Sequence, residues 1–161
     1  MKIVMVIPKL ILAGAETMCE NLSLELVKMG HEVTVIALFN NECAVSQRMR
    51  DGGVKVITLG KKVGFDKSMY TKLETIFNDE KPDVIHTHLY VTKYAIPAAK
   101  DLDVRKVHTM HNLAKMENLT IGGNFLNRIF FKHKNVIPVA LSEKIQASVV
   151  KKYHLKKENV P

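Results

Sequence analysis

Short apolar segments of strand length alternate with longer segments of helical period along the whole chain. Lys2–Ile7 is an almost continuous apolar run, and Glu32–Leu38 is short and rich in β-branched residues. Between them, Ala15–Met29 places its apolar side chains on one helical face and is followed by Gly30. An alternation of this kind is typical of a parallel α/β sheet that is covered by helices on both faces.

The same alternation continues through the sequence and predicts six strands in total. The further strands are expected at Val54–Leu59, Val84–His88, Arg105–Met110 and Val136–Leu141. The further helices are expected at Ala44–Arg50, Lys67–Asn78, Thr92–Lys100 and Asn124–Lys132, with a last one capped by Ser142 and running to about His154. Right-handed crossovers then give a Rossmann-like, doubly wound parallel sheet of about six strands.

Length and composition are those of one globular domain. The chain has 161 residues, of which 47% are hydrophobic and 25% charged, so we expect a single domain over 1–161 with its own core. Cys19 and Cys43 are too few for a disulfide framework, and we interpret them as reduced thiols of a cytoplasmic protein. No apolar run approaches the length that spans a bilayer, and Lys2–Ile7 is interpreted as a strand rather than a signal peptide.

Positive charge is concentrated towards the C-terminal end. The formal net charge is +8, and residues 111–161 hold nine basic side chains against three acidic ones. Such a surplus suggests an anionic partner (nucleic acid, a phosphorylated molecule or an anionic membrane surface) or else only a solvated surface.

The segment Asn124–Lys134 mixes aromatic, aliphatic and basic residues, which is also the pattern of a helix lying on a membrane. We favour a core-facing stripe of Phe125, Ile129 and Phe130. Nucleic-acid binding is not favoured, because no recognised binding module surrounds this segment.

Ligands of open α/β sheets bind beyond the carboxyl ends of the strands. After the first strand, the segment Pro8–Ala13 leads to Gly14 and Ala15 at the start of a helix, where free N–H groups favour an anion or a sugar hydroxyl. The Gly-x-Gly-x-x-Gly fingerprint is missing, so a dinucleotide is not favoured. The alternative is that Gly14 only makes room for helix packing.

Four histidines stand at the ends of two neighbouring strands. We interpret His86 and His108 as hydrogen-bonded core residues, whereas His88 and His111 are expected further out, where they could bind a hydroxyl or act near a reacting centre. A metal site is not favoured, because no carboxylate or thiol stands at ligand spacing from these histidines.

Five segments carry a resemblance to a known family when they are taken in order. They are Ala13–Glu16, Gly30–Val33, Lys81–His88, Val107–Asn112 and Val139–Glu143, preceded by the first strand. Together they resemble the N-terminal half of a family 4 glycosyltransferase of the GT-B fold, over essentially the whole chain.

The resemblance implies the acceptor-binding half of a retaining enzyme that moves a sugar from a nucleotide-sugar to a glycan or lipid-linked acceptor. Such enzymes usually need no metal or other cofactor, and the nucleotide-sugar is a co-substrate held mainly by the C-terminal half. His111 is the implied catalytic residue. The implied substrate-binding residues are Ala13, Gly14, Ala15, His88 and Asn112. Ala13 stands where the family often has a second glycine.

The sequence stops at Pro161, before the Asn-Gly-φ-Asp and Glu-x7-Glu segments that the family carries in its second half. We therefore expect the donor-binding domain to be absent and this polypeptide alone to be inactive. It is expected in the cytoplasm, or peripherally at the inner face of the membrane.

Two other functions stay open at this point. The chain could be a non-enzymatic subunit that presents an acceptor or docks on a membrane for a separate catalytic chain. A nucleotide-binding, flavodoxin-like domain is less favoured, because the sequence has no phosphate loop.

Overall fold

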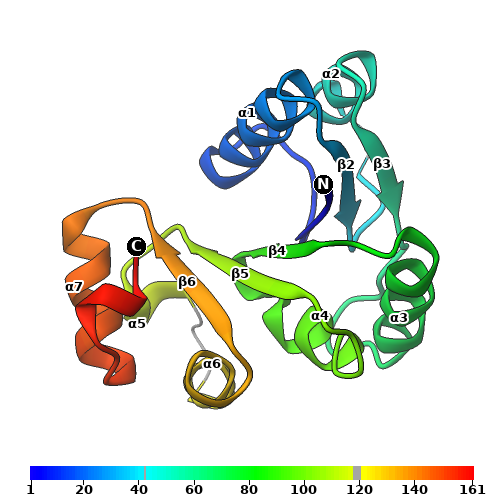
Figure 1. Ribbon diagram of the computed structural model, residues 1–161. Coiled ribbons are helices and arrows are strands. Elements are labelled where there is room, and N and C mark those ends of the chain that lie inside the picture. Colours follow the sequence, from blue (N-terminus) through cyan, green and yellow to red (C-terminus); the bar gives the residue numbers. More distant parts are fainter. Residues whose placement is uncertain (42, 118–120) are drawn as a thin grey trace.

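The computed structural model describes residues 1–41, 43–117 and 121–161 and shows one six-stranded sheet. All neighbouring strands are parallel, in the order β3-β2-β1-β4-β5-β6 (Figure 1). The strands are β1 (Lys2–Ile7), β2 (Glu32–Ala37), β3 (Lys55–Thr58), β4 (Val84–His88), β5 (Arg105–Met110) and β6 (Val136–Ala140). The predicted fold class, a doubly wound Rossmann-like sheet of six strands, is confirmed.

Helices connect the strands. They are α1 (Gly14–Lys28), α2 (Ala44–Asp51), α3 (Ser68–Glu80), α4 (Thr92–Ala98), α5 (Ala114–Glu117), α6 (Ile121–His133) and α7 (Glu143–Tyr153), with short 3-10 turns η1 (Leu89–Val91) and η2 (Lys157–Asn159). In Figure 1, α1 and α2 lie together beside β1–β3, and α3 and α4 lie on the other side. The sequence predicted each of the longer helices to within a few residues, but it missed α5, η1 and η2.

Several helix ends follow from local chemistry. The chain leaves α1 through Gly30, whose φ of 83° lies in the left-handed region that glycine tolerates best. At the start of α7, the Ser142 hydroxyl accepts the backbone N–H of Ile145, as the sequence predicted for a capping residue.

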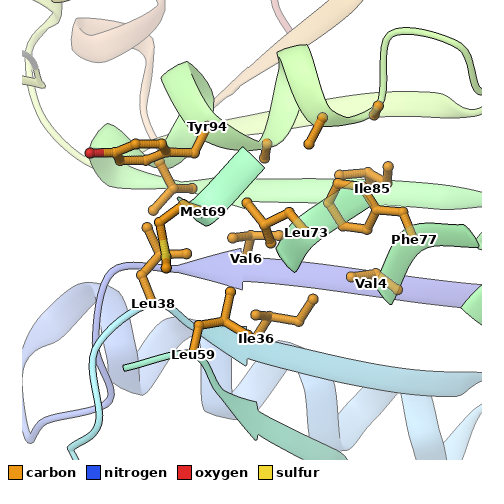
Figure 2. Close-up of a cluster of buried hydrophobic side chains, with 14 residues drawn as sticks. Val4, Val6, Ile36, Leu38, Leu59, Met69, Leu73, Phe77, Ile85 and Tyr94 are labelled. Atoms are coloured by element: carbon orange, nitrogen blue, oxygen red, sulfur yellow. The ribbon is translucent and has the colours of Figure 1, made fainter. Parts of the chain in front are cut away.

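Two apolar cores lie on opposite faces of β1 and β2, because successive side chains of a strand point to opposite faces. On one face Ile3, Met5 and Ile7 pack under α1 and α2. On the other face Val4 and Val6 meet Met69, Leu73 and Phe77 of α3, which Figure 2 shows pointing at the strand. A strand covered on both faces is apolar at nearly every position unless its polar side chains are hydrogen-bonded, which explains the unbroken run in β1.

A third core joins α6 and α7 to β5 and β6. Phe130 and Phe131 of α6 pack with Val149 and Tyr153 of α7 in this cluster. Phe125, predicted to face the core beside Ile129 and Phe130, is 63% exposed instead. The inward face of α6 runs through the buried Asn127, which accepts a hydrogen bond from Thr92 Oγ1 at 2.9 Å.

Both cysteines are free thiols, as the sequence predicted. Cys19 is buried in α1, and burial, with the nearby Glu16 and Glu20, raises its pKa to about 12. The Cys43 thiol, which is partly buried, donates to the carbonyl of Leu10 at 3.1 Å.

Candidate functional site

The strand order changes direction between β1 and β4, and the chain leaves these two neighbours towards opposite edges of the sheet. Such a switch point leaves a crevice at the carboxyl ends of the strands, where open α/β sheets bind ligands. On one side of it lies the segment from Pro8 to the start of α1. On the other side lie His88 at the end of β4 and His111 just after β5.

The first turn of α1 is open and uncapped. Ala13 has the extended backbone of a capping residue (φ −147°, ψ 170°), but its methyl side chain can accept no hydrogen bond from the turn. Ala13 and Gly14 are exposed. A Cβ at Gly14 would meet no atom within 4 Å, so this glycine is not needed for helix packing and leaves space in front of the helix.

The first turn of α1 also carries a buried acid. Glu16 is 4% exposed, and its charge, after burial and the nearby Tyr94, helps to raise the pKa of Tyr90 in η1. This electrostatic link places the start of α1 near the segment that follows β4. An acidic group in this turn already interacts with the helix dipole, so the free N–H groups suit a hydroxyl better than a second anion.

Two of the four histidines are hydrogen-bonded core residues, as predicted. His86 Nε2 lies 2.7 Å from Thr109 Oγ1, and His108 Nδ1 lies 3.0 Å from Thr87 Oγ1. Both pairs join β4 to β5, whose parallel register sets His86 beside Val107 and Thr87 beside His108. The alternation along the strands sends His86 and Thr109 to one face of the sheet and Thr87 and His108 to the other.

His88 and His111 form a direct pair. His88 Nδ1 lies 3.0 Å from His111 Nε2, and the two rings are 5.3 Å apart between centroids. His88, expected towards the open edge, is fully buried, whereas His111 is partly exposed. His111 is therefore the histidine that a ligand can reach, and His88 contacts its ring from the buried side.

All four imidazoles are neutral at neutral pH. Burial lowers the pKa of His86 to about 4 and that of His108 to about 3, and repulsion among the histidines adds to both shifts. Burial also moves the pKa of His88 well below its usual range and lowers that of His111. A neutral His88–His111 pair shares one proton along its hydrogen bond, so the outer nitrogen of His111 can donate or accept.

Glu117 was not singled out in the sequence. This residue at the end of α5 is 6% exposed as a whole and its side chain is fully buried, and its Oε2 accepts the backbone N–H of Asn112 at 2.9 Å. Burial raises the pKa of Glu117 to about 7, although the backbone N–H groups of Asn112 and His111 act in the opposite direction. Glu117 thereby contacts the turn that carries two of the predicted site residues. Its spacing from them follows no motif, so no sequence signal pointed to it.

The structure thus brings His88, the last residue of β4, together with His111 in the turn that follows β5 and also carries Asn112. Ala13, Gly14 and Ala15 lie at the start of α1, in the connection that follows the adjacent β1. Among residues 1–41, 43–117 and 121–161, no group of three or more His, Cys, Asp or Glu side chains could hold a metal ion. Within the same residues, no helix has both the length and the apolar character needed to cross a bilayer.

Comparison with known families gives one match by sequence. Residues 12–161 match the model of Glycosyltransferase Family 4. No curated protein matches the chain.

Solved structures match the fold. A glycosyltransferase from Rickettsia africae superposes with a TM-score of 0.78 at 14% identity, covering 99% of this chain and 41% of that one. Anabaena Alr3699/HepE, solved with UDP and glucose, gives a TM-score of 0.74 at 14% identity, covering 100% of this chain and 43% of that one. A UDP-GlcNAc 2-epimerase from Neisseria meningitidis gives 0.61 at 15% identity, covering 99% and 45%. This chain therefore spans less than half of each, and the shared fold is that of their Rossmann-like half.

Proposed function

The chain belongs to Glycosyltransferase Family 4, and we propose that it is the acceptor-binding half of a retaining enzyme that transfers a sugar from a nucleotide-sugar to a glycan or lipid-linked acceptor. One observation carries this proposal. A partly exposed, neutral His111 stands at the same edge of the sheet as the open, uncapped start of α1, on the two sides of the switch point.

In this proposal, His111 hydrogen-bonds a hydroxyl of the acceptor or of the transferred sugar. Its ring is held by His88, and its low pKa keeps it neutral, so it orients a hydroxyl without adding a charge. The N–H groups at Gly14 and Ala15 bind a second hydroxyl. The charge that develops on the departing diphosphate requires fixed cations or dipoles, which we assign to the donor-binding half. We propose that no metal takes part.

Exposed apolar side chains at the carboxyl edge support a partner half. Leu12 follows β1, Phe65 follows β3 and Leu141 follows β6, and they are 81%, 59% and 46% exposed. These residues follow strands in the centre and at both sides of the sheet, and large apolar side chains left exposed beyond the carboxyl ends of strands suit a surface that another domain covers. The same observation supports the second candidate, an acceptor-presenting subunit whose catalytic half is a separate chain. The mass of the native protein in its source cells distinguishes the two.

A groove between α5 and α7 supports an anionic membrane or lipid-linked acceptor. It has a volume of about 600 Å³, with Leu113 and Met116 on its apolar side and the lysines Lys115, Lys151 and Lys152 around it. Apolar side chains flanked by cations suit the boundary between headgroups and acyl chains. We propose that the protein works in the cytoplasm at that surface. Flotation with liposomes that contain anionic lipid tests this, and no binding at moderate salt would contradict it.

Ligand binding to the isolated chain tests the acceptor role. We expect monosaccharides, disaccharides or their 1-phosphates to shift the His111 imidazole signals in NMR spectra in a saturable manner. Gly14→Val fills the space before α1, and His111→Ala removes the ring, so each should abolish the shifts in a folded protein. Gly122→Val is the matched control, because a Cβ at Gly122 on α6 also meets open space.

The absence of saturable shifts with the whole panel would refute the acceptor role. Equal losses in Gly122→Val would show that the site variants act only through the fold. A radiolabelled transfer assay with nucleotide-sugars should show no turnover by this polypeptide alone.

A further inference from the structure

Within the part of the chain that the structure describes, two buried polar atoms lie opposite each other without a hydrogen-bond partner. His108 Nε2 and Glu117 Oε1 are 3.7 Å apart, and both side chains are fully buried. At this separation neither atom is hydrogen-bonded, although unpaired buried polar atoms are rare in folded proteins. The pair lies beneath the turn that carries His111, so its protonation state affects the candidate site.

The position of one proton follows from the neighbouring threonine. The Thr87 hydroxyl lies 3.1 Å from the Val107 carbonyl, which can only accept, so we assign the single hydroxyl hydrogen to that bond. Towards His108 the hydroxyl then accepts, and the 3.0 Å contact with His108 Nδ1 places a hydrogen on that nitrogen. In a neutral His108, Nε2 is then a bare lone pair that points at the carboxyl of Glu117.

A lone pair facing an ionised carboxylate is repulsive, so the pair must hold one further proton. That proton makes either an imidazolium facing a carboxylate or a neutral imidazole facing a carboxylic acid. Burial of both side chains favours the two neutral groups, because taking two charges out of water costs more than their attraction returns when they are 3.7 Å apart without a hydrogen bond. The raised pKa of Glu117 (about 7) and the lowered pKa of His108 (about 3) agree with the neutral pair.

Every neighbouring ionisable group favours the same assignment. His86 and His111 lower the pKa of His108 by repulsion. On the α7 side, Tyr153 is near Glu117, whose charge helps to raise the pKa of that tyrosine. From α6, the ring of Phe131 stacks on His108 with centroids 5.9 Å apart and supplies no charge. None of these groups provides a cation that would stabilise an ionised Glu117.

The second carboxyl oxygen connects this pair to the site. Glu117 Oε2 holds the Asn112 N–H at 2.9 Å, and the preceding residue, His111, contacts His88 at 3.0 Å. We propose that Glu117 is a positioning residue that, as a neutral acid, directs its O–H at His108 and holds the His111–Asn112 turn in place with its other oxygen. The effect on sugar transfer rests on the proposed function, but the proton assignment does not.

Two substitutions of the full chain test the assignment. Glu117→Gln keeps an oxygen for the Asn112 N–H and supplies an N–H for His108, so it mimics the neutral acid at every pH. Glu117→Leu removes both contacts. Glu74→Gln is the matched control, because Glu74 is exposed on the distant α3. Imidazole nitrogen spectra report the tautomer of His108 and the surroundings of His111 in each variant.

For the wild type we expect a neutral His108 with its proton on Nδ1, and a transition near pH 7 in the His111 signals. Glu117→Gln should keep the signals that the wild type gives below the transition and should lose the transition itself, whereas Glu117→Leu should shift the His111 signals at every pH. A merely structural role would not remove the transition in the glutamine variant. If the leucine variant does not fold, the comparison of Glu117→Gln with the wild type still decides.

An imidazolium at His108 in the wild type would overturn the proposal, as would a glutamine variant that retains the transition. These spectra need no donor or acceptor. Failure of the sugar-binding experiment therefore counts against the proposed function alone, and failure of this one counts against the role of Glu117 alone.

Discussion

Strands β1 and β4 are hydrogen-bonded neighbours, yet their buried interiors are of opposite kinds. β1 sets Met5 and Val6 in fully apolar surroundings, whereas the residues in register with them on β4 are His86 and Thr87. The same difference extends outwards, since the buried side chains of β2 are apolar except for Thr34, whereas β5 carries His108 and Thr109. The half of the sheet formed by β1–β3 is therefore mainly apolar inside (the dry half), and the other half buries Thr87, His88, His108 and Thr109 (the polar half).

This difference marks β4 and β5 as the part of the sheet in which buried polar side chains are retained. Buried polar groups destabilise a protein unless they are paired, and apolar residues would serve the sheet equally well. Four buried side-chain atoms of the described residues lack a hydrogen-bond partner, and all belong to the polar half and its covering helices. They are His88 Nε2, His108 Nε2, Glu117 Oε1 and Asn127 Nδ2. The polar half thus contains buried polar atoms without a hydrogen-bond partner, as expected beside the site that we propose for a polar ligand.

Lowering the pH should have the largest effect on stability, because the buried histidines all belong to the polar half. His86 and His108 have folded pKa values of about 4 and about 3, below the usual 6.5, so the unfolded chain binds protons that the native state cannot. Stability should therefore fall as pH drops from about 6.5 to 4. The neutral Glu117 acts in the opposite direction, because its raised pKa makes stability fall as pH rises from about 4.5 to 7.

The histidines outnumber this single acid, so we expect a net loss on the order of 5 kcal/mol at pH 4, measured by urea unfolding at a series of pH values. His108→Gln should flatten the curve. His133→Gln, which changes an exposed histidine of α6, should leave it unchanged. A stability that does not change between pH 6.5 and 4 would mean that the buried histidines are protonated in the native state.

Exchanging the side chains of two residues that lie opposite each other on β1 and β4 should change the free energy of unfolding by a smaller amount. Thr87 and Val6 are aligned on adjacent strands, and threonine and valine have nearly the same shape. Thr87→Val leaves the His108 Nδ1–H without its acceptor, and Val6→Thr buries a hydroxyl in an apolar core. Each should destabilise the protein by about 1–3 kcal/mol, measured by urea unfolding. Thr75→Val on the exposed face of α3 should change stability by less than about 0.5 kcal/mol. A neutral Thr87→Val would show that the hydroxyl is dispensable and would also remove the basis for placing the proton on Nδ1.

The dry half was the easier one to predict from sequence. An almost continuous apolar run predicts β1, a short segment rich in β-branched residues predicts β2, and glycine and proline set most helix ends to within a few residues. The hydrogen-bonded roles of His86 and His108 were also predictable, since both lie within strands. Alternation along a strand gives the face of a side chain but not its depth, which is why His88 was expected too far out.

The remaining features depend on tertiary contacts. The four-residue helix α5 is too short to show a helical period, so Glu117 carried no signal in the sequence. The inward face of α6 includes a polar residue, Asn127, which is buried because Thr92 of α4 satisfies its oxygen. A prediction from hydrophobicity alone therefore placed Ile129 and Phe130 correctly against the core but placed Phe125 there as well. The candidate site residues were hardest to predict where they break the rule that interiors are apolar.

The smallest expected change in stability concerns the N-terminal caps of α7 in the polar half and of α1 in the dry half. In the polar half, Ser142 caps α7, and Ser142→Ala should cost about 1 kcal/mol in urea unfolding. In the dry half, Ala13 already has the backbone of a cap but lacks an acceptor, so Ala13→Ser should stabilise the protein by up to about 1 kcal/mol. The new hydroxyl would occupy the N–H groups that we assign to a sugar hydroxyl, so the same variant should bind the saccharide probes more weakly. A gain in stability without a loss of binding would place the ligand elsewhere on the edge. No gain at all would mean that these N–H groups are already satisfied by water, and the missing cap would then be no sign of a site.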